Sequence, residues 1–92
     1  KNNLLIYDVR KKDEFYSESL SNAINLPLNN IQTNINKFSK KDEFYIHCKT
    51  GYRSVIASSY LKLKGFKKIM NIKSGFEGLK KTNIKINSLI SI

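Results

Sequence analysis

The feature that most constrains the fold of this 92-residue chain is a series of short apolar runs alternating with segments of helical pattern. The runs occupy residues 4–7, 23–28, 44–48 and 69–72. Short continuous apolar runs are typical of strands that are buried on both faces of a sheet. Because parallel neighbours need a crossover connection, the alternation predicts an α/β fold with a small parallel β-sheet, of four or five strands, flanked by helices.

Two short helices are predicted between the first three runs. Asp13 is expected to cap the first of them, with Phe15 and Tyr16 as its inward residues. Ile31 and Phe38 belong to an apolar set at spacings of four and three, which predicts a short amphipathic helix; the third member of the set is Ile35.

A longer helix is predicted over residues 53–64, closed by Gly65 as a C-cap. Its expected inward stripe is Val55, Ile56, Ser59, Tyr60 and Leu63. Residues 74–80 are expected to form a turn and a final short helix. The tail after residue 82 alternates only weakly between apolar and polar side chains.

The length fits a single domain over residues 1–92. The chain starts at Lys1 rather than at methionine, directly before an apolar run, which predicts a fragment of a longer polypeptide. No run approaches the ~18 apolar residues of a membrane span, and no signal peptide is visible. We therefore expect a cytoplasmic protein without a membrane partner.

The net charge of +10 is carried by the part of the chain after residue 36, because residues 1–36 hold four basic and four acidic side chains. A nucleic-acid surface, a field that draws small anions, and a plain bias toward lysine are the candidate explanations. Lys, Asn and Ile make up 38 residues, which favours bias. The lysines are not interleaved with exposed aromatics, so no nucleic-acid partner is expected.

The only cysteine, Cys48, lies where the third apolar run ends and a short loop leads into the long helix. Backbone N–H groups of the loop, the bend that Gly51 allows, the charge of Arg53 and the helix N-terminus near Ser54 all favour a thiolate. The loop residues that we expect to bind substrate are Lys49, Thr50, Gly51, Tyr52 and Arg53. A lone cysteine excludes an internal disulfide, and no metal ligand set or cofactor is expected.

Asp8 and Arg10 follow the first run, so parallel strands would bring Asp8 and Cys48 to the same edge of the sheet, where ligands bind in such folds. His47 alternates with Cys48 along its strand and should face the opposite side, as a packed or surface histidine. Ser54 is expected to act as a helix cap rather than a nucleophile.

Four segments together resemble a rhodanese-like domain: residues 8–10 with Glu14 and Phe15, residues 23–28, residues 48–54 and residues 71–76. The resemblance implies a rhodanese-type sulfurtransferase in which Cys48 cycles between thiolate and persulfide. Its partners would be a small anionic sulfur donor, such as thiosulfate or a persulfide, and a thiol, cyanide or protein acceptor. It also implies that Arg53 folds back toward Asp8 as a structural strut.

The Cys48 segment and residues 55–59 also resemble the rhodanese modules that follow metallo-β-lactamase-fold hydrolases in bacterial persulfide-handling proteins. A fused hydrolase domain is therefore one candidate partner. Two departures from the family pattern stand out. Residues 19–22 replace the usual glycine and histidine before Ala23, which puts the anchoring of the second strand in question. The opening strand and helix of the family are also absent.

Two other functions remain open. Cysteine-dependent phosphatases also combine a cysteine, backbone N–H groups and an arginine, but they place the arginine six positions after the cysteine. Here Arg53 comes five positions after Cys48, so the ring of loop residues between them is one residue too small to fit a phosphoryl group. A catalytically idle module that binds or regulates a partner is the second alternative, although inactive members of the family commonly lose the cysteine.

Overall fold

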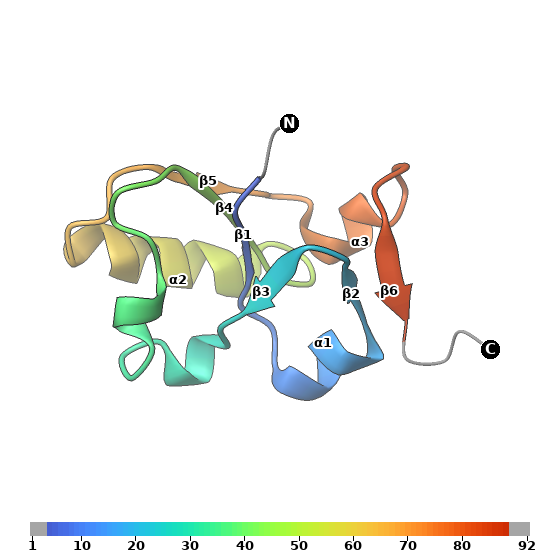
Figure 1. Cartoon of the computed structure of the whole chain (residues 1–92), viewed down its shortest axis with the longest axis horizontal. Helices are drawn as coiled ribbons and strands as arrows, with labels where there is room; N and C mark the ends of the chain where they lie inside the picture. Colours follow the sequence, from blue (N-terminus) through green and yellow to red (C-terminus); the bar gives the residue numbers. More distant parts are fainter. Residues whose placement is uncertain (1–3, 89–92) are drawn as a thin grey trace.

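The computed structural model describes residues 4–88, and its centre is a four-stranded parallel sheet (Figure 1). In spatial order the strands are β3 (Ala23–Asn25), β1 (Ile6–Asp8), β4 (Phe44–His47) and β5 (Ile69–Asn71). Each strand is parallel to its neighbours, so the carboxyl ends of all four meet at one edge. The predicted α/β fold with a small parallel sheet is confirmed.

Helices connect these strands, and a second sheet lies at one end of the molecule. The connecting helices are α1 (Lys12–Ser17), the 3₁₀ helices η1 (Leu28–Asn30) and η2 (Ile35–Lys37), and α2 (Tyr52–Leu63), whereas α3 (Gly75–Leu79) follows the last strand of the main sheet. The second sheet pairs β2 (Glu18–Leu20) with β6 (Ile86–Ser88) in antiparallel fashion, beside α3 and at the far end from the C-terminus of α2 (Figure 1). This pairing joins segments that sequence patterns left without an element.

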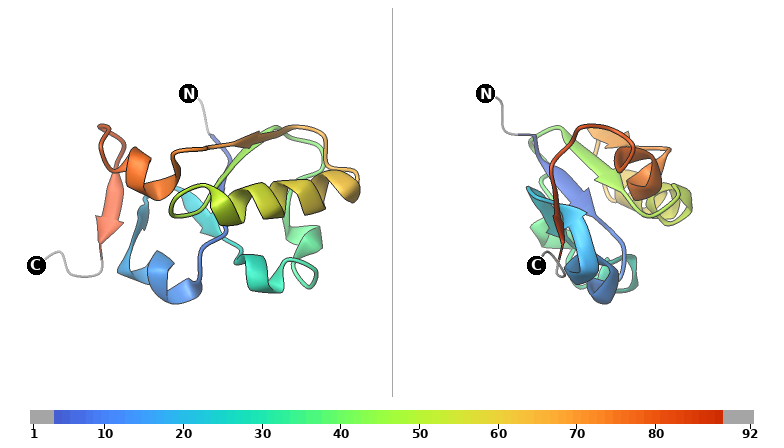
Figure 2. Two further views of the ribbon diagram at one scale, coloured as in Figure 1. Left: turned by 180° about the vertical axis from the view of Figure 1, so that it is seen from behind. Right: turned by 90° about the vertical axis from the view of Figure 1, so that its right-hand side faces the viewer.

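The two faces of the main sheet carry separate apolar clusters. The larger one lies under α2 and the segment around η1 and η2; its members include Tyr7, Leu26, Phe38, Phe44, Ile46, Cys48, Ala57, Leu61 and Phe66. The smaller one contains Ile6, Leu20 and Phe76. The right-hand view of Figure 2 shows α2 to one side of the strands. Because side chains alternate along β4, Cys48 belongs to the first cluster, whereas His47 stacks on Phe76 at the second.

The face that α2 buries is not the predicted one. Its buried residues are Ser54, Ala57, Ser58 and Leu61, whereas Val55, Ile56 and Leu63 of the predicted stripe are exposed. Small side chains at positions 54, 57 and 58 let the helix lie close to the sheet, so the apolar stripe on its other side faces outward. Gly65 adopts a left-handed φ of 97° after the helix, as a C-cap requires.

The prediction of one amphipathic helix with Ile31, Ile35 and Phe38 on its inner face is also wrong. The segment forms two separate 3₁₀ helices joined by a turn. Asparagine is a poor helix former, and several asparagines interrupt this stretch. The apolar residues nevertheless reach the core, because Ile31 and Phe38 are buried and Ile35 packs against them.

Helix α1 differs from its prediction in two details. Lys11, not Asp13, occupies the N-cap, and its N–H donates to the Glu14 side chain at 2.9 Å. Tyr16 is exposed and Phe15 is half-buried. A helix of only six residues has too short an apolar face to turn both aromatic rings inward.

Strand β3 is anchored by Asn25, although the histidine that the resemblance implies is missing from this sequence. The side-chain amide of Asn25 donates to the carbonyl oxygens of Asp8 and Arg10, at 2.9 and 3.0 Å. These bonds tie β3 to the carboxyl end of β1. Asparagine therefore provides the anchor that the departure in residues 19–22 had put in question.

Within residues 4–88, no helix is long and apolar enough to cross a membrane. The same part of the chain brings no three His, Cys, Asp or Glu side chains together in a group that could hold a metal ion.

Candidate active site

Cys48 lies at the carboxyl end of β4 inside a loop that donates hydrogen bonds to its sulfur. We call residues 48–54 the Cys48 loop. The cysteine is 1% exposed, and its Sγ accepts the N–H groups of Gly51 and Ser54, both at 3.2 Å. The Ser54 hydroxyl lies 3.5 Å from Sγ. The sulfur is therefore held by donors from the turn and from the first turn of α2.

These contacts determine the acidity of the thiol. Burial raises the pKa of Cys48, but hydrogen bonds from the Ser54 hydroxyl and from the N–H groups of Ser54, Gly51 and Thr50 together outweigh it. The pKa of Cys48 is lowered as a result. Each donor stabilises the thiolate and offers nothing comparable to the neutral thiol.

Ser54 acts within the helix rather than as its cap, contrary to the prediction. Gly51 occupies the N-cap position of α2, with a left-handed φ of 103°. The Ser54 hydroxyl also donates to the Gly51 carbonyl, at 3.2 Å. Its single proton can therefore serve that carbonyl while Cys48 is a thiol and turn to Sγ when a thiolate forms.

A second segment, residues 72–77, clamps the Cys48 loop from outside. The Phe76 N–H donates to the Cys48 carbonyl at 2.7 Å, and the Glu77 N–H donates to the Lys49 carbonyl at 3.0 Å. A Cβ on Gly51 would collide with the Lys73 carbonyl, and one on Gly75 would collide with the Lys49 carbonyl. Both positions therefore require glycine, because backbone approaches backbone there.

The resemblance implied a contact between Arg53 and Asp8, but the structure pairs Arg53 with Glu14 of α1 instead. Its guanidinium donates to both carboxylate oxygens, at 2.7 and 3.0 Å. Hydrogen bonding from Arg53 lowers the pKa of Glu14 to about 2, and the same contact raises the pKa of Arg53. The strut role of Arg53 is retained with a different carboxylate.

Asp8 is engaged by Arg10 instead, on the face of the sheet opposite Cys48. The Arg10 side chain donates to both Asp8 oxygens, the closest contact being 2.8 Å, and also to the Glu18 carbonyl at 2.7 Å. Arg10 lies 4.2 Å from the centre of the Phe76 ring. Asp8 and Arg10 are both buried, so this pair links β1 to α3 inside the domain.

His47 is a fully buried support for the Cys48 backbone. Its Nδ1 lies 3.0 Å from the Cys48 carbonyl, which can only accept, so Nδ1 carries the proton. Its Nε2 lies 3.7 Å from an Asp8 oxygen and has no hydrogen-bond partner among the described residues. Burial lowers the pKa of His47, so the ring is neutral at pH 7. The strand alternation correctly placed His47 on the face opposite Cys48, left open whether it is packed or exposed, and gave no sign of this bond.

The mouth of the site carries the remaining predicted residues. Lys49, Thr50 and Tyr52 are exposed, and Tyr52 is 76% exposed. An open hollow of about 530 Å³ lies beside the loop, lined by Lys11, Asp13, Glu14, Lys49 and Arg53. Glu14 forms an ion pair with Arg53, whereas the ammonium groups of Lys11 and Lys49 form no ion pair with a carboxylate among the described residues.

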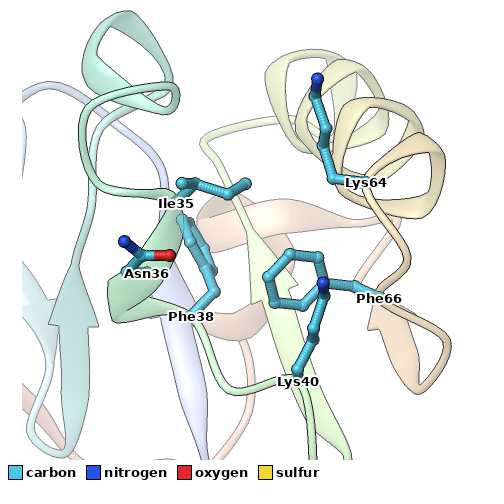
Figure 3. A pocket seen from close by; sticks show the side chains of 6 residues that line it. All are labelled: Ile35, Asn36, Phe38, Lys40, Lys64 and Phe66. Carbon is cyan, nitrogen blue, oxygen red and sulfur yellow. The ribbon is translucent and has the colours of Figure 1, made fainter.

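A second hollow, of about 380 Å³, lies between η2 and the C-terminal end of α2 (Figure 3). Its lining is Ile35, Asn36, Phe38, Lys40, Lys64 and Phe66, and the Lys40 ammonium lies 5.3 Å from the centre of the Phe66 ring. It contains neither a thiol nor a carboxylate. The candidate site is therefore the Cys48 loop, at the opposite end of α2.

The structure is thus an α/β domain with a hydrogen-bonded cysteine loop at the carboxyl edge of a parallel sheet. Comparison with protein families identifies the family: the model described as Rhodanese-like domain matches residues 1–82. The chain belongs to this family.

Named relatives agree with this assignment. The thiosulfate sulfurtransferase GlpE of Coxiella burnetii is 30% identical over 77 residues, which cover 84% of this chain and 72% of the relative. YrkF of Bacillus subtilis, whose name assigns it a sulfur carrier function, is 35% identical over 72 residues, and the match spans only 39% of its length. Among solved structures, a rhodanese-like domain protein from Staphylococcus aureus superposes with a TM-score of 0.83 at 30% identity, covering 96% of this chain and 85% of that one.

Proposed function

We propose that this domain is a sulfurtransferase that carries sulfane sulfur as a persulfide on Cys48. The observation that carries the proposal is the set of hydrogen bonds on Sγ, which lowers the pKa of a buried thiol. Attack on an anionic sulfur donor needs a nucleophilic thiolate, and the open hollow beside the Cys48 loop, lined by three cationic and two acidic side chains, offers such a donor an approach. The family and the sulfurtransferase name of the Coxiella relative point the same way.

The first step loads the cysteine. The Cys48 thiolate attacks the outer sulfur of thiosulfate, a new S–S bond forms, and sulfite leaves with the electron pair of the old bond. The charges balance, because a monoanion and a dianion give a persulfide monoanion and a sulfite dianion. Lys49 and Lys11 stand at the hollow where such an anion would approach. A low-molecular-weight persulfide could deliver the same sulfur.

The second step unloads it. A thiolate or cyanide attacks the outer sulfur of the Cys48 persulfide, and the Cys48 thiolate leaves. The N–H groups that stabilise the thiolate make it a good leaving group. The N–H groups of Tyr52 and Arg53 at the start of α2 have no preceding helical turn to accept from them, so they can stabilise the outer sulfur while it is carried. No cysteine of this chain can resolve the persulfide, since Cys48 is the only one.

The test is an intact-mass measurement of the reduced protein after exposure to thiosulfate and, separately, to glutathione persulfide. We expect the wild type to gain the mass of one sulfur atom, and Cys48→Ser to gain nothing. Cyanide should then return the protein to its original mass and release thiocyanate. If neither donor adds sulfur to a folded wild-type domain, the enzyme proposal is wrong and the idle module becomes the better explanation.

A further inference from the structure

An exposed apolar face of α2 begins at the Cys48 loop and runs along the helix. We call it the α2 stripe; its members are Tyr52, Val55, Ile56, Ser59 and Leu63. Val55 is 50% exposed, Ile56 44% and Leu63 86%. At about 100° per residue these five positions share an arc of about 100°, opposite the buried face of the helix. No other described element lies outside α2 in the views of Figure 2.

We propose that the α2 stripe docks a protein that accepts sulfur from Cys48, through a thiol set in an apolar surface with an acidic rim. This inference rests on the proposed sulfurtransferase function. It names the kind of acceptor, which the chemistry of the loop alone leaves open.

Continuity with the reacting sulfur is the first argument for this partner. Tyr52 is both the first residue of α2 and part of the Cys48 loop. The donors to Sγ, Gly51 and Ser54, flank it in sequence. A surface seated on Val55 and Ile56 therefore lies beside the mouth of the site, where the outer sulfur of a persulfide would emerge.

Charge is the second argument. Between residues 49 and 73 the chain has no acidic residue, whereas its basic residues there are Lys49, Arg53, Lys62, Lys64, Lys67, Lys68 and Lys73. Lys62 and Lys64 are exposed near the C-terminal end of the stripe, and Lys49 is exposed at the other end. An apolar strip between exposed lysines is complementary to an apolar surface that is rimmed by carboxylates.

The same charges argue against a second copy of this chain as the occupant. Two stripes brought face to face would oppose lysine to lysine, on chains that each carry a net charge of +10. A stripe about 17 Å long is also too small for a permanent dimer, but it suits a transient contact. A sulfur carrier needs such a contact, because it must release its acceptor after each transfer.

The docked transfer is a thiol–persulfide exchange with no net oxidation. The thiolate of the partner attacks the outer sulfur of the Cys48 persulfide, the S–S bond to Cys48 breaks, and Cys48 leaves as a thiolate. The partner then carries the persulfide. Docking on the stripe raises the local concentration of that thiolate, so it accelerates this step and leaves the reaction with cyanide unchanged.

The experiment measures the unloading rate of the Cys48 persulfide with matched synthetic peptides and with cyanide. The first peptide holds one cysteine among leucines and glutamates; a second replaces the glutamates by lysines, and a third replaces the leucines by alanines. The variants are Ile56→Glu and Leu63→Ser. The matched control is Ile24→Glu, because Ile24 on β3 is 46% exposed, close to the 44% of Ile56, but lies away from the stripe.

We expect the wild-type persulfide to react about tenfold faster with the acidic, leucine-containing peptide than with either of the other two peptides. Both stripe variants should lose most of this difference in rate. Ile24→Glu should retain it. All variants should load sulfur and react with cyanide as the wild type does, after melting curves show that they are folded.

Three results would overturn the proposal: equal rates for the matched peptides, equal losses in Ile24→Glu and Ile56→Glu, or an Ile56-dependent binding to anionic vesicles without any peptide preference. Each of these leaves the sulfurtransferase function standing if cyanide still removes sulfur from Cys48. A wild type that never loads sulfur would instead refute the function itself, and the acceptor proposal with it.

Discussion

Arg53 binds both carboxylate oxygens of Glu14, at 2.7 and 3.0 Å, and so fastens α1 to the first turn of α2 beside Cys48. The two residues are 39 positions apart, and the contact is the only charged link between these helices among the described residues. It also occupies the arginine that phosphate chemistry would require in the loop. The phosphatase alternative thus meets a second difficulty besides the short ring.

The first prediction concerns this ion pair. Glu14→Gln should lower the free energy of unfolding at pH 7 by about 1 kcal/mol or less, because both side chains are partly exposed to solvent. Folding lowers the pKa of Glu14 from 4.5 to about 2, so the contribution is complete above pH 4.5 and is lost as the pH falls toward 2. Urea titrations of both proteins across this range measure the difference.

Glu18→Gln serves as the control for that measurement. Glu18 also forms an ion pair, with Lys80 at 3.1 Å, but it lies on β2 and away from the Cys48 loop. Only Glu14→Gln should change the rate of sulfur loading as well. A constant stability difference between pH 7 and pH 2 for Glu14→Gln would show that the ion pair contributes nothing.

How far the sequence predicts the fold depends on whether the signal is local. Parallel strands, the Cys48 turn and the Gly65 C-cap were predictable, because short apolar runs and glycines act within a few residues. The orientation of α2 was not predictable, since the apolar periodicity indicated that the side with Val55 and Ile56 would face the core. Burial of Ser54 and Ser58 depends on how closely the helix approaches β4, which only tertiary packing decides.

The site was predictable to a similar extent. The position of Cys48 and its donors follows from the order of strand, loop and helix. The partner of Arg53 does not follow from that order, because Asp8 and Glu14 are both acidic residues near the same strand end and either could bind it. Arg10, two residues after Asp8, takes that carboxylate with its backbone N–H and its guanidinium. Because Arg10 already binds the Asp8 carboxylate, Glu14 is the acidic residue that remains for Arg53.

The second prediction concerns the glycines of the loop. Gly51→Ala should cost more than about 2 kcal/mol and slow alkylation of Cys48, because a methyl group there adds a collision with the Lys73 carbonyl to the strain of a positive φ. Gly65→Ala is the matched control. Its φ of 97° is similar, but only the flexible end of Lys40 is near, so about 1 kcal/mol is expected. Equal costs in urea denaturation would refute the role of the backbone contact.

The third prediction concerns the thiolate. The rate of Cys48 alkylation by iodoacetamide should rise with pH around a midpoint below that of an ordinary thiol, since hydrogen bonds lower its pKa. Ser54→Ala removes the hydroxyl donor and should raise the midpoint by about one pH unit or less. Ser58→Ala should not move it, because the Ser58 hydroxyl is buried on the same helix face without a hydrogen-bond partner in the described structure. Identical midpoints for the two variants would exclude the Ser54 hydroxyl as a donor to the thiolate, since both variants keep the Ser54 N–H.

The fourth prediction concerns His47, whose neutral ring donates from Nδ1 to the Cys48 carbonyl. Burial lowers its pKa below the ordinary 6.5, against opposing effects of Asp8 and the Cys48 carbonyl and with a small contribution from Arg10 in the same direction. Below pH 6.5 the unfolded chain therefore takes up a proton that the folded chain refuses. The stability that the neutral ring provides is present above this pH and is lost as the pH falls toward the lowered pKa.

Replacing His47 by asparagine isolates this effect, since the asparagine amide can still donate to the Cys48 carbonyl but does not titrate. His47→Asn should be less stable than the wild type at pH 7.5, and the difference should shrink as the pH falls below 6.5, before the contribution of Glu14 starts to be lost at about pH 4.5. His47→Phe keeps the ring but has no donor, so it should also slow sulfur loading by Cys48, whereas His47→Asn should retain most of the rate. A wild-type stability that changes in parallel with that of His47→Asn across this range would mean that the ring titrates normally and that its burial has no effect on its protonation.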